Sequence, residues 1–183
     1  MEQTPILNQL LRTESGRLRL GWRLVLFAVI TVVVAAVTTA FFPTAFITAQ
    51  AALLVGAVSS GVLLLRLDRR PAGALGFYTR RAAISEASLG LGLGTVVALA
   101  VVALMAAAGG LRWTAQDGSV FAWFVGSLGA LAFLAIPAAA EEALLRGYPL
   151  QALGEVYGPW AAIIVTAIVF GALHLFNPNL TFL

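Results

Sequence analysis

Long apolar runs alternate with short polar segments along the whole chain. The complete runs cover approximately residues 22–42, 44–65, 83–108 and 121–140, and a fifth run begins at Trp160. Each complete run is close to the roughly 20 residues that an α-helix needs to cross a bilayer. In lipid, backbone polar groups must be satisfied within the protein, and a helix does this within one segment. The pattern predicts an all-α fold, a polytopic transmembrane helical bundle with about five spans.

The polar segments define the domain organisation. Residues 1–21 are polar and predict a cytoplasmic lead-in, amphipathic or partly disordered, and residues 22–183 predict one membrane-embedded domain. After the fourth run the helical pattern continues to residue 153, and a turn follows at 154–159. A straight helix over this length would exceed the roughly 30 Å hydrocarbon core. We therefore expect a break at Pro137, or a tilted bundle with a wet site.

Composition narrows the class of protein. Hydrophobic residues make up 61% of the chain and charged residues 10%, whereas soluble domains carry about a quarter charged residues. Cysteine is absent, which excludes disulfides and thiolate metal sites. All 11 basic residues are arginines and most flank apolar runs, which is typical of membrane topology. We therefore expect membrane lipid as a partner and no nucleic acid.

Arginine placement predicts the orientation. Four arginines lie at the start of the first run and five lie in the loop 66–81, but only Arg112 lies in the loop 109–118. Because positive residues favour the cytoplasmic side, the N-terminus and the loop 66–81 are predicted to be cytoplasmic. The protein is then a multi-pass protein of the cell (inner or plasma) membrane, with Glu141 in the cytoplasmic half of its span.

The candidate chemistry lies in the last third of the chain. Glu141 and Glu142 end the fourth apolar run, Arg146 follows one turn later, and the only histidine, His174, lies in the fifth run. Ionisable groups in membrane segments are functional candidates by default. Residues four apart share a helix face, so Glu142 and Arg146 are predicted to form a buried supporting ion pair. Glu141 projects about 100° away and stays available as a base.

A hairpin would bring the acid and the histidine to one depth. At 1.5 Å per residue, Glu141 lies about 18 Å before the predicted turn and His174 about 21 Å after it. Phe170 lies one turn before His174 on the same face. Simpler interpretations stay open, because the acids also suit a solvated helix end and a lone histidine often serves as an interfacial hydrogen-bonding residue.

These residues resemble the motifs of the CPBP family of membrane proteases, which includes type II CAAX prenyl endopeptidases and bacterial bacteriocin-processing or immunity proteins. The motif Glu-Glu-x-x-x-Arg is matched by Glu141, Glu142 and Arg146, and the motif Phe-x-x-x-His is matched by Phe170 and His174. Motif-level similarity covers approximately residues 135–180, and the upstream spans match in hydrophobic layout.

The resemblance implies an intramembrane endopeptidase in which Glu141 and His174 activate a water molecule, supported by Glu142, Arg146 and Phe170. The family also has a third motif, a second histidine followed four residues later by asparagine or aspartate. This chain has no second histidine. We therefore expect a C-terminally incomplete chain that is inactive by itself.

The chemistry and the function class have alternatives. Two carboxylates and one histidine can hold Zn²⁺, and a metal-dependent enzyme would use Glu141 and His174. We favour no cofactor, because Arg146 competes with a metal ion for the Glu142 carboxylate. The predicted partner is a peptide or protein substrate, as in CAAX processing or bacteriocin or leader-peptide processing. The rival interpretations are a non-catalytic immunity or scaffold protein of the same fold, and a transporter fragment with a carboxylate proton site.

Overall fold

The computed structural model describes residues 10–42, 45–76, 81–114 and 117–175. Among these residues the chain is helical and contains no strand, apart from an isolated antiparallel bridge between Arg12 and Leu18. Four described helices are long and apolar enough to cross a membrane, and a fifth apolar helix is shorter. The prediction of an all-α, polytopic membrane fold is confirmed.

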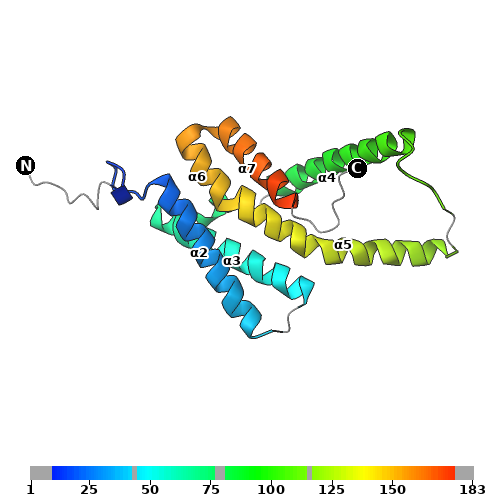
Figure 1. The fold of residues 1–183 in the computed structure, drawn as a ribbon, viewed down its shortest axis with the longest axis horizontal. Coiled ribbons are helices and arrows are strands. Elements are labelled where there is room, and N and C mark those ends of the chain that lie inside the picture. The colour runs from blue at the N-terminus through cyan, green and yellow to red at the C-terminus, as the bar shows by residue number, and fades with distance from the viewer. Residues whose placement is uncertain (1–9, 43–44, 77–80, 115–116, 176–183) are drawn as a thin grey trace, which may run out of the picture. The chain divides into compact units, whose positions relative to one another are not determined.

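The helices follow the predicted runs closely (Figure 1). In chain order they are α2 (Leu20–Ala40), α3 (Phe46–Leu67), the short 3₁₀ helix η1 (Ala72–Leu75), α4 (Arg81–Ala107), α5 (Val120–Glu142), the π-helical turn η2 (Ala143–Gly147), α6 (Tyr148–Tyr157) and α7 (Pro159–His174). The motif helix extends to Tyr157, so the predicted turn over residues 154–159 is reduced to Gly158. In its 16 residues, α7 rises about 24 Å, which is less than the roughly 30 Å core.

The chain forms two compact units. Residues Met1–Gly76 and Gly129–Leu183 form unit 1, and Phe77–Leu128 form unit 2. Unit 2 contains α4 and the first part of α5. A glycine C-cap ends α4. Gly109 has a φ of 75°, and the Gly110 amide donates to the Met105 carbonyl. The candidate chemistry lies in unit 1.

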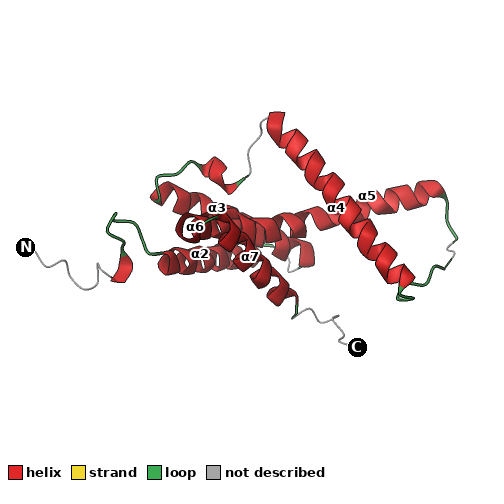
Figure 2. Ribbon diagram, turned by 90° about the horizontal axis from the view of Figure 1, so that it is seen from above, coloured by secondary structure: helices red, strands yellow, loops and turns green. Residues whose placement is uncertain are grey.

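In unit 1, α2 and α3 pack as an antiparallel hairpin (Figure 2). Thr31 of α2 is hydrogen-bonded to Ser60 of α3 at 2.7 Å between their hydroxyl oxygens. Gly56 lies against the backbone of Thr31 so closely that an added Cβ would come within 2.5 Å of its carbonyl oxygen. Small residues thus let the two backbones approach, as is common between membrane helices.

The helix that carries the acidic motif does not break at Pro137. That proline is buried within α5, and the helical run continues to Glu142. The irregularity comes later, at η2, and the chain changes direction between α5 and α6 (Figure 1). The predicted break at Pro137 is therefore wrong, and the π-helical turn is where the motif helix bends.

The turn between α6 and α7 depends on Gly158. Its φ of 83° and ψ of 165° lie in a region that is essentially restricted to glycine. Pro159 follows as the first residue of α7, where its missing N–H costs nothing. The two helices then pack against each other, with Gly154 of α6 facing Ala162 of α7. The predicted turn is present, but the first arm of this hairpin begins at Tyr148, after the bend at η2, and does not include Glu141.

Candidate active site

The acidic motif straddles the end of a regular helix and a widened turn. Glu141 and Glu142 are the last residues of α5, and Arg146 lies in η2. Pro149 lies just beyond η2 and cannot donate a backbone hydrogen bond, and its ring would crowd the carbonyl of Leu145 in a regular helix. The wider π turn accommodates this proline. Such π-helical turns are frequent at functional sites.

Glu142 and Arg146 form the predicted ion pair between the Glu142 carboxylate and the Arg146 guanidinium. The predicted burial of this pair is wrong, because the two side chains are 47% and 57% exposed in this chain. An exposed pair at this spacing contributes little to stability. The pair nevertheless leaves the Glu142 carboxylate bound to Arg146.

Glu141 points in a different direction and is only partly buried. Within the described part of the chain, Glu141 has no hydrogen-bond or ion-pair partner, whereas its neighbour Glu142 is bound to Arg146. The predicted division between one paired and one available carboxylate therefore agrees with the geometry.

The second motif fixes the orientation of its histidine. Nδ1 of His174 lies 2.9 Å from the backbone carbonyl oxygen of Phe170, and the two rings are 4.3 Å apart between centroids. A carbonyl can only accept a hydrogen bond, so Nδ1 carries the hydrogen. In the neutral ring, Nε2 then holds the free lone pair. The His174 side chain is exposed at the end of α7.

The two motifs are each assembled, but no bond joins them. Among the hydrogen bonds and ion pairs of the described residues, none connects Glu141 with His174. The prediction that they lie level assumed one straight helix from Glu141 to the turn, whereas the chain bends at η2; α7 does contact η2. A shared water between them stays a prediction.

The described residues form no cluster of three histidine, aspartate or glutamate side chains that could hold a metal ion. Glu142 is occupied by Arg146, and Nδ1 of His174 is occupied by a carbonyl. Glu141 and Nε2 of His174, the two groups that the sequence offers to a metal, have no other partner among the described residues; metal-free chemistry stays a prediction, and we derive no step through a metal.

The structure contains a polar cluster that the sequence did not reveal. It consists of Arg23 from the first turn of α2, Asp68 just after α3, and Tyr148 and Glu155 from α6. Arg23 is one of the four arginines at the start of the first apolar run, which by themselves indicate only topology. The available signal was that Arg23 lies inside an apolar span, where a charged side chain normally has a specific partner.

Arg23 uses three guanidinium nitrogens on three acceptors. Nε donates to the Tyr148 hydroxyl at 2.8 Å, one terminal nitrogen donates to Asp68 Oδ2 at 2.6 Å, and the other donates to Glu155 Oε2 at 2.9 Å. The Tyr148 hydroxyl donates in turn to Asp68 Oδ2 at 2.9 Å. No buried side-chain polar atom among the described residues lacks a partner. The planar arginine fork suits such a set of acceptors, whereas lysine would present a point charge.

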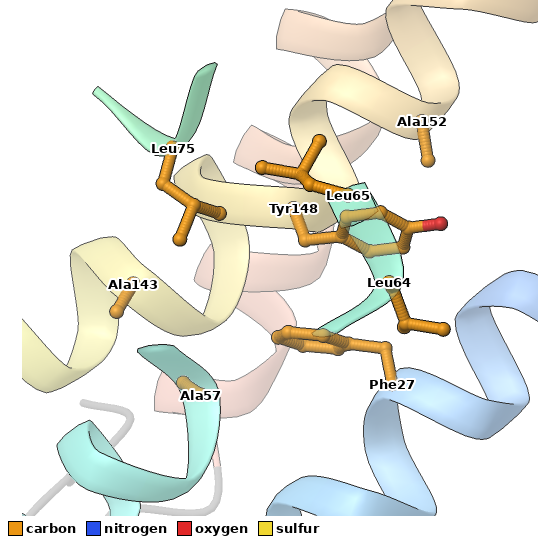
Figure 3. Packing of buried hydrophobic residues seen from close by; sticks show 8 residues of the cluster. All are labelled: Phe27, Ala57, Leu64, Leu65, Leu75, Ala143, Tyr148 and Ala152. Carbon is orange, nitrogen blue, oxygen red and sulfur yellow. The ribbon is translucent and has the colours of Figure 1, made fainter. Parts of the chain in front are cut away.

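Tyr148 joins this polar cluster to the apolar core (Figure 3). Its ring stacks on Phe27 of α2 at 5.7 Å between centroids and lies among Leu64, Leu65 and Leu75. Its hydroxyl points away from Leu75 toward the polar cluster. The residue is fully buried. Because Tyr148 follows η2 directly, the cluster fixes the motif helix to the hairpin of α2 and α3.

Fold and composition define this chain as a polytopic helical membrane protein, with two polar motifs on successive segments of unit 1. Residues 122–183, about one third of the chain, match the family described as type II CAAX prenyl endopeptidase Rce1-like. The match includes α5 from its first turn, both motifs and α7, and it supports a CPBP family protein. The comparison with curated proteins and the comparison with solved structures found no match.

Proposed function

We propose that this protein is an intramembrane endopeptidase in which Glu141 and His174 activate water. One observation carries the proposal. In the two motifs, Glu142 is bound to Arg146, and Nδ1 of His174 is bound to the Phe170 carbonyl. The Glu141 carboxylate and Nε2 of His174 have no partner among the described residues. The match to a protease family supports the same conclusion.

In the proposed reaction, Glu141 acts as the general base. It takes a proton from water while the water oxygen forms a bond to the carbon of the scissile peptide carbonyl. Nε2 of His174 accepts a hydrogen bond from the same water and orients it. The carbon–nitrogen bond then breaks, and the proton held by Glu141 passes to the departing amine. The products are a carboxylic acid and an amine, and both side chains return to their starting states.

The proposed substrate is a peptide held at the membrane. The family description, type II CAAX prenyl endopeptidase, suggests CAAX peptides as the first substrate class, and leader peptides are the second class that we consider. Nothing in unit 1 distinguishes a prenyl group from an apolar peptide segment. The experiment therefore includes both classes.

The test uses a strain that lacks the protein and is complemented with the complete gene or its variants, expressed in the native membrane. Membrane and secreted peptides are compared by mass spectrometry for cleaved and uncleaved termini, with and without prenyl groups. Glu141→Gln and His174→Ala should each lower cleavage by about 10²–10⁴-fold. The double variant should be little worse than either single variant, because groups acting as a unit are non-additive.

Glu86→Gln is the matched control, because Glu86 is an exposed glutamate on α4 in unit 2. It should cleave like the wild type. Full cleavage by a stably expressed Glu141→Gln variant would contradict the proposed role of Glu141. A strain without the protein that accumulates no uncleaved peptide would favour a non-catalytic member of the fold.

A further inference from the structure

A basic cavity lies at the end of unit 1 where α2 begins and α3 ends. Its volume is about 560 Å³, and its lining includes Arg12, Ser15, Arg17, Leu67, Asp68 and Arg69. The cavity is separate from the acidic motif and from His174, which it does not include. The proposed peptidase chemistry makes no use of it.

The cavity wall on the N-terminal side is an ordered turn. The Thr13 amide donates to the Arg17 carbonyl at 2.7 Å, and the Arg19 amide donates to the Leu11 carbonyl at 2.9 Å. Arg12 donates to the carbonyl of Gly16 at 2.8 Å. These bonds hold the segment before α2 in one conformation, so its arginines are presented in fixed positions.

Arg17 attaches this turn to the other wall. Its guanidinium donates to the backbone carbonyl of Asp68 at 2.9 Å, just after the end of α3. The next residue, Arg69, has a φ of 58°, an uncommon conformation for a residue other than glycine. The Arg70 amide donates to the Leu65 carbonyl at 2.8 Å and the Arg69 amide donates to the Arg66 carbonyl at 3.0 Å, so this conformation is the Schellman cap that ends α3. The two walls therefore form one structure rather than two loose loops.

Among the described residues, one of the three arginines that line the cavity is paired with an acid: Arg17 lies 3.6 Å from Glu155 Oε2, whereas Arg12 and Arg69 form no ion pair. The Asp68 carboxylate is bound by Arg23 and Tyr148, and Glu155 is bound by Arg23 and Arg70. Glu14 is exposed and is not part of the lining. Arg69 has no hydrogen-bond or ion-pair partner among the described residues. The cavity thus presents arginine groups to an anion.

The position of the cavity at the ends of two membrane helices indicates which kind of anion it binds. The apolar helix α2 begins beside the cavity and the apolar helix α3 ends beside it. The cavity therefore lies at the boundary between the membrane core and the headgroups. Leu67 lines the cavity and is 64% exposed, and Leu63, one turn earlier on α3, is 45% exposed. These leucines provide an apolar track from the cavity toward the membrane core.

We propose that this cavity binds the phosphate of an anionic phospholipid headgroup, with an acyl chain along Leu67 and Leu63. Arginine binds phosphate oxygens in a bidentate manner, which favours Arg12 and Arg69 as the contacts. Basic pockets beside membrane helices are a known way to hold such headgroups. The predicted cytoplasmic position of this end agrees, because the cytoplasmic leaflet carries anionic lipid.

The test measures lipid retention by native mass spectrometry of the whole purified chain. Dioleoyl phosphatidylglycerol and dioleoyl phosphatidylcholine are added in equal amounts, and the ratio of the two lipids retained per chain is determined. The wild type should retain one phosphatidylglycerol in preference. Arg69→Gln and Arg12→Gln should each lower this preference by about fivefold, the effect expected for one arginine near a lipid surface.

Arg66→Gln is the matched control, because Arg66 is an exposed arginine in the last turn of α3 that does not line the cavity. It should retain the wild-type preference. An equal loss in Arg66→Gln and Arg69→Gln, or no preference in the wild type, would overturn the site. A final arm adds millimolar inorganic phosphate. Displacement of the lipid by free phosphate would overturn the assignment to a lipid headgroup, and persistence of the lipid supports it.

Discussion

Arg23 and Asp68 form an ion pair with 2.6 Å between nitrogen and oxygen, and their side chains are only 5% and 7% exposed. The first residue lies in the first turn of α2 and the second lies just beyond the end of α3. Their contact closes the open end of the α2–α3 hairpin. Through Tyr148 and Glu155 it also fixes α6 to that hairpin.

We expect Arg23→Gln to lower the free energy of unfolding by about 3–5 kcal/mol, because it leaves the Asp68 carboxylate buried without its cation. Arg23→Lys should also destabilise the protein, since an ammonium group cannot reproduce the three-way fork. Unfolding in mixed micelles with rising dodecyl sulfate, followed by tryptophan fluorescence, measures this change. Arg66→Gln is the control. A loss for Arg23→Gln no larger than for that control would show that the buried cluster is not structural.

Tyr148→Phe tests the hydroxyl that bridges Arg23 and Asp68. The ring and its stacking on Phe27 remain, so the expected loss is smaller, about 1–3 kcal/mol. Tyr157→Phe, at an exposed tyrosine of the same helix, should change the unfolding free energy very little. Equal effects of the two substitutions in the micelle assay would argue against the bridge.

The helices were predictable because apolar length alone determines a membrane span. The Glu142–Arg146 pair and the Phe170–His174 contact were predictable as well, since both are local to one helix turn. The Arg23 cluster was not, because it joins residues up to 132 positions apart, and no pattern in a single sequence gives that pairing. A break at Pro137 was one of the two expectations for the long motif helix, whereas the bend lies at η2 and Pro149 is the proline that adjoins it. Whether Glu141 and His174 share a water is set by packing beyond either motif.

Arg146→Gln should have only a small effect on stability. Its pair with Glu142 is about half exposed, and such pairs contribute roughly 0–1 kcal/mol. The same micelle titration, run beside Arg23→Gln, compares an exposed pair with a buried one. A loss for Arg146→Gln that equals the loss for Arg23→Gln would mean that the Glu142–Arg146 pair is buried in the assembled protein.

The orientation can be tested because the chain has no native cysteine. A single cysteine at Ser15 should be protected from an impermeant thiol reagent in intact cells, since arginine bias predicts a cytoplasmic N-terminus. A cysteine at Thr114 should react, because its loop is predicted to lie outside. Both should react after the membrane is opened. The reverse labelling pattern in intact cells would invert the topology and place the basic cavity on the outer side.

Gly158→Ala tests the hairpin that carries the histidine. A φ of 83° with a ψ of 165° is strained for any residue with a Cβ, so we expect a loss of about 1–3 kcal/mol. Gly129→Ala is the matched control, because Gly129 lies within α5 and nothing is found within 4 Å of an added Cβ. Alanine at that helical position should be neutral or slightly stabilising. If Gly158→Ala were as stable as Gly129→Ala, the turn would tolerate another conformation and would not fix α7 against α6. If Gly158→Ala also lowers the cleavage rate per folded protein, the turn helps to position His174.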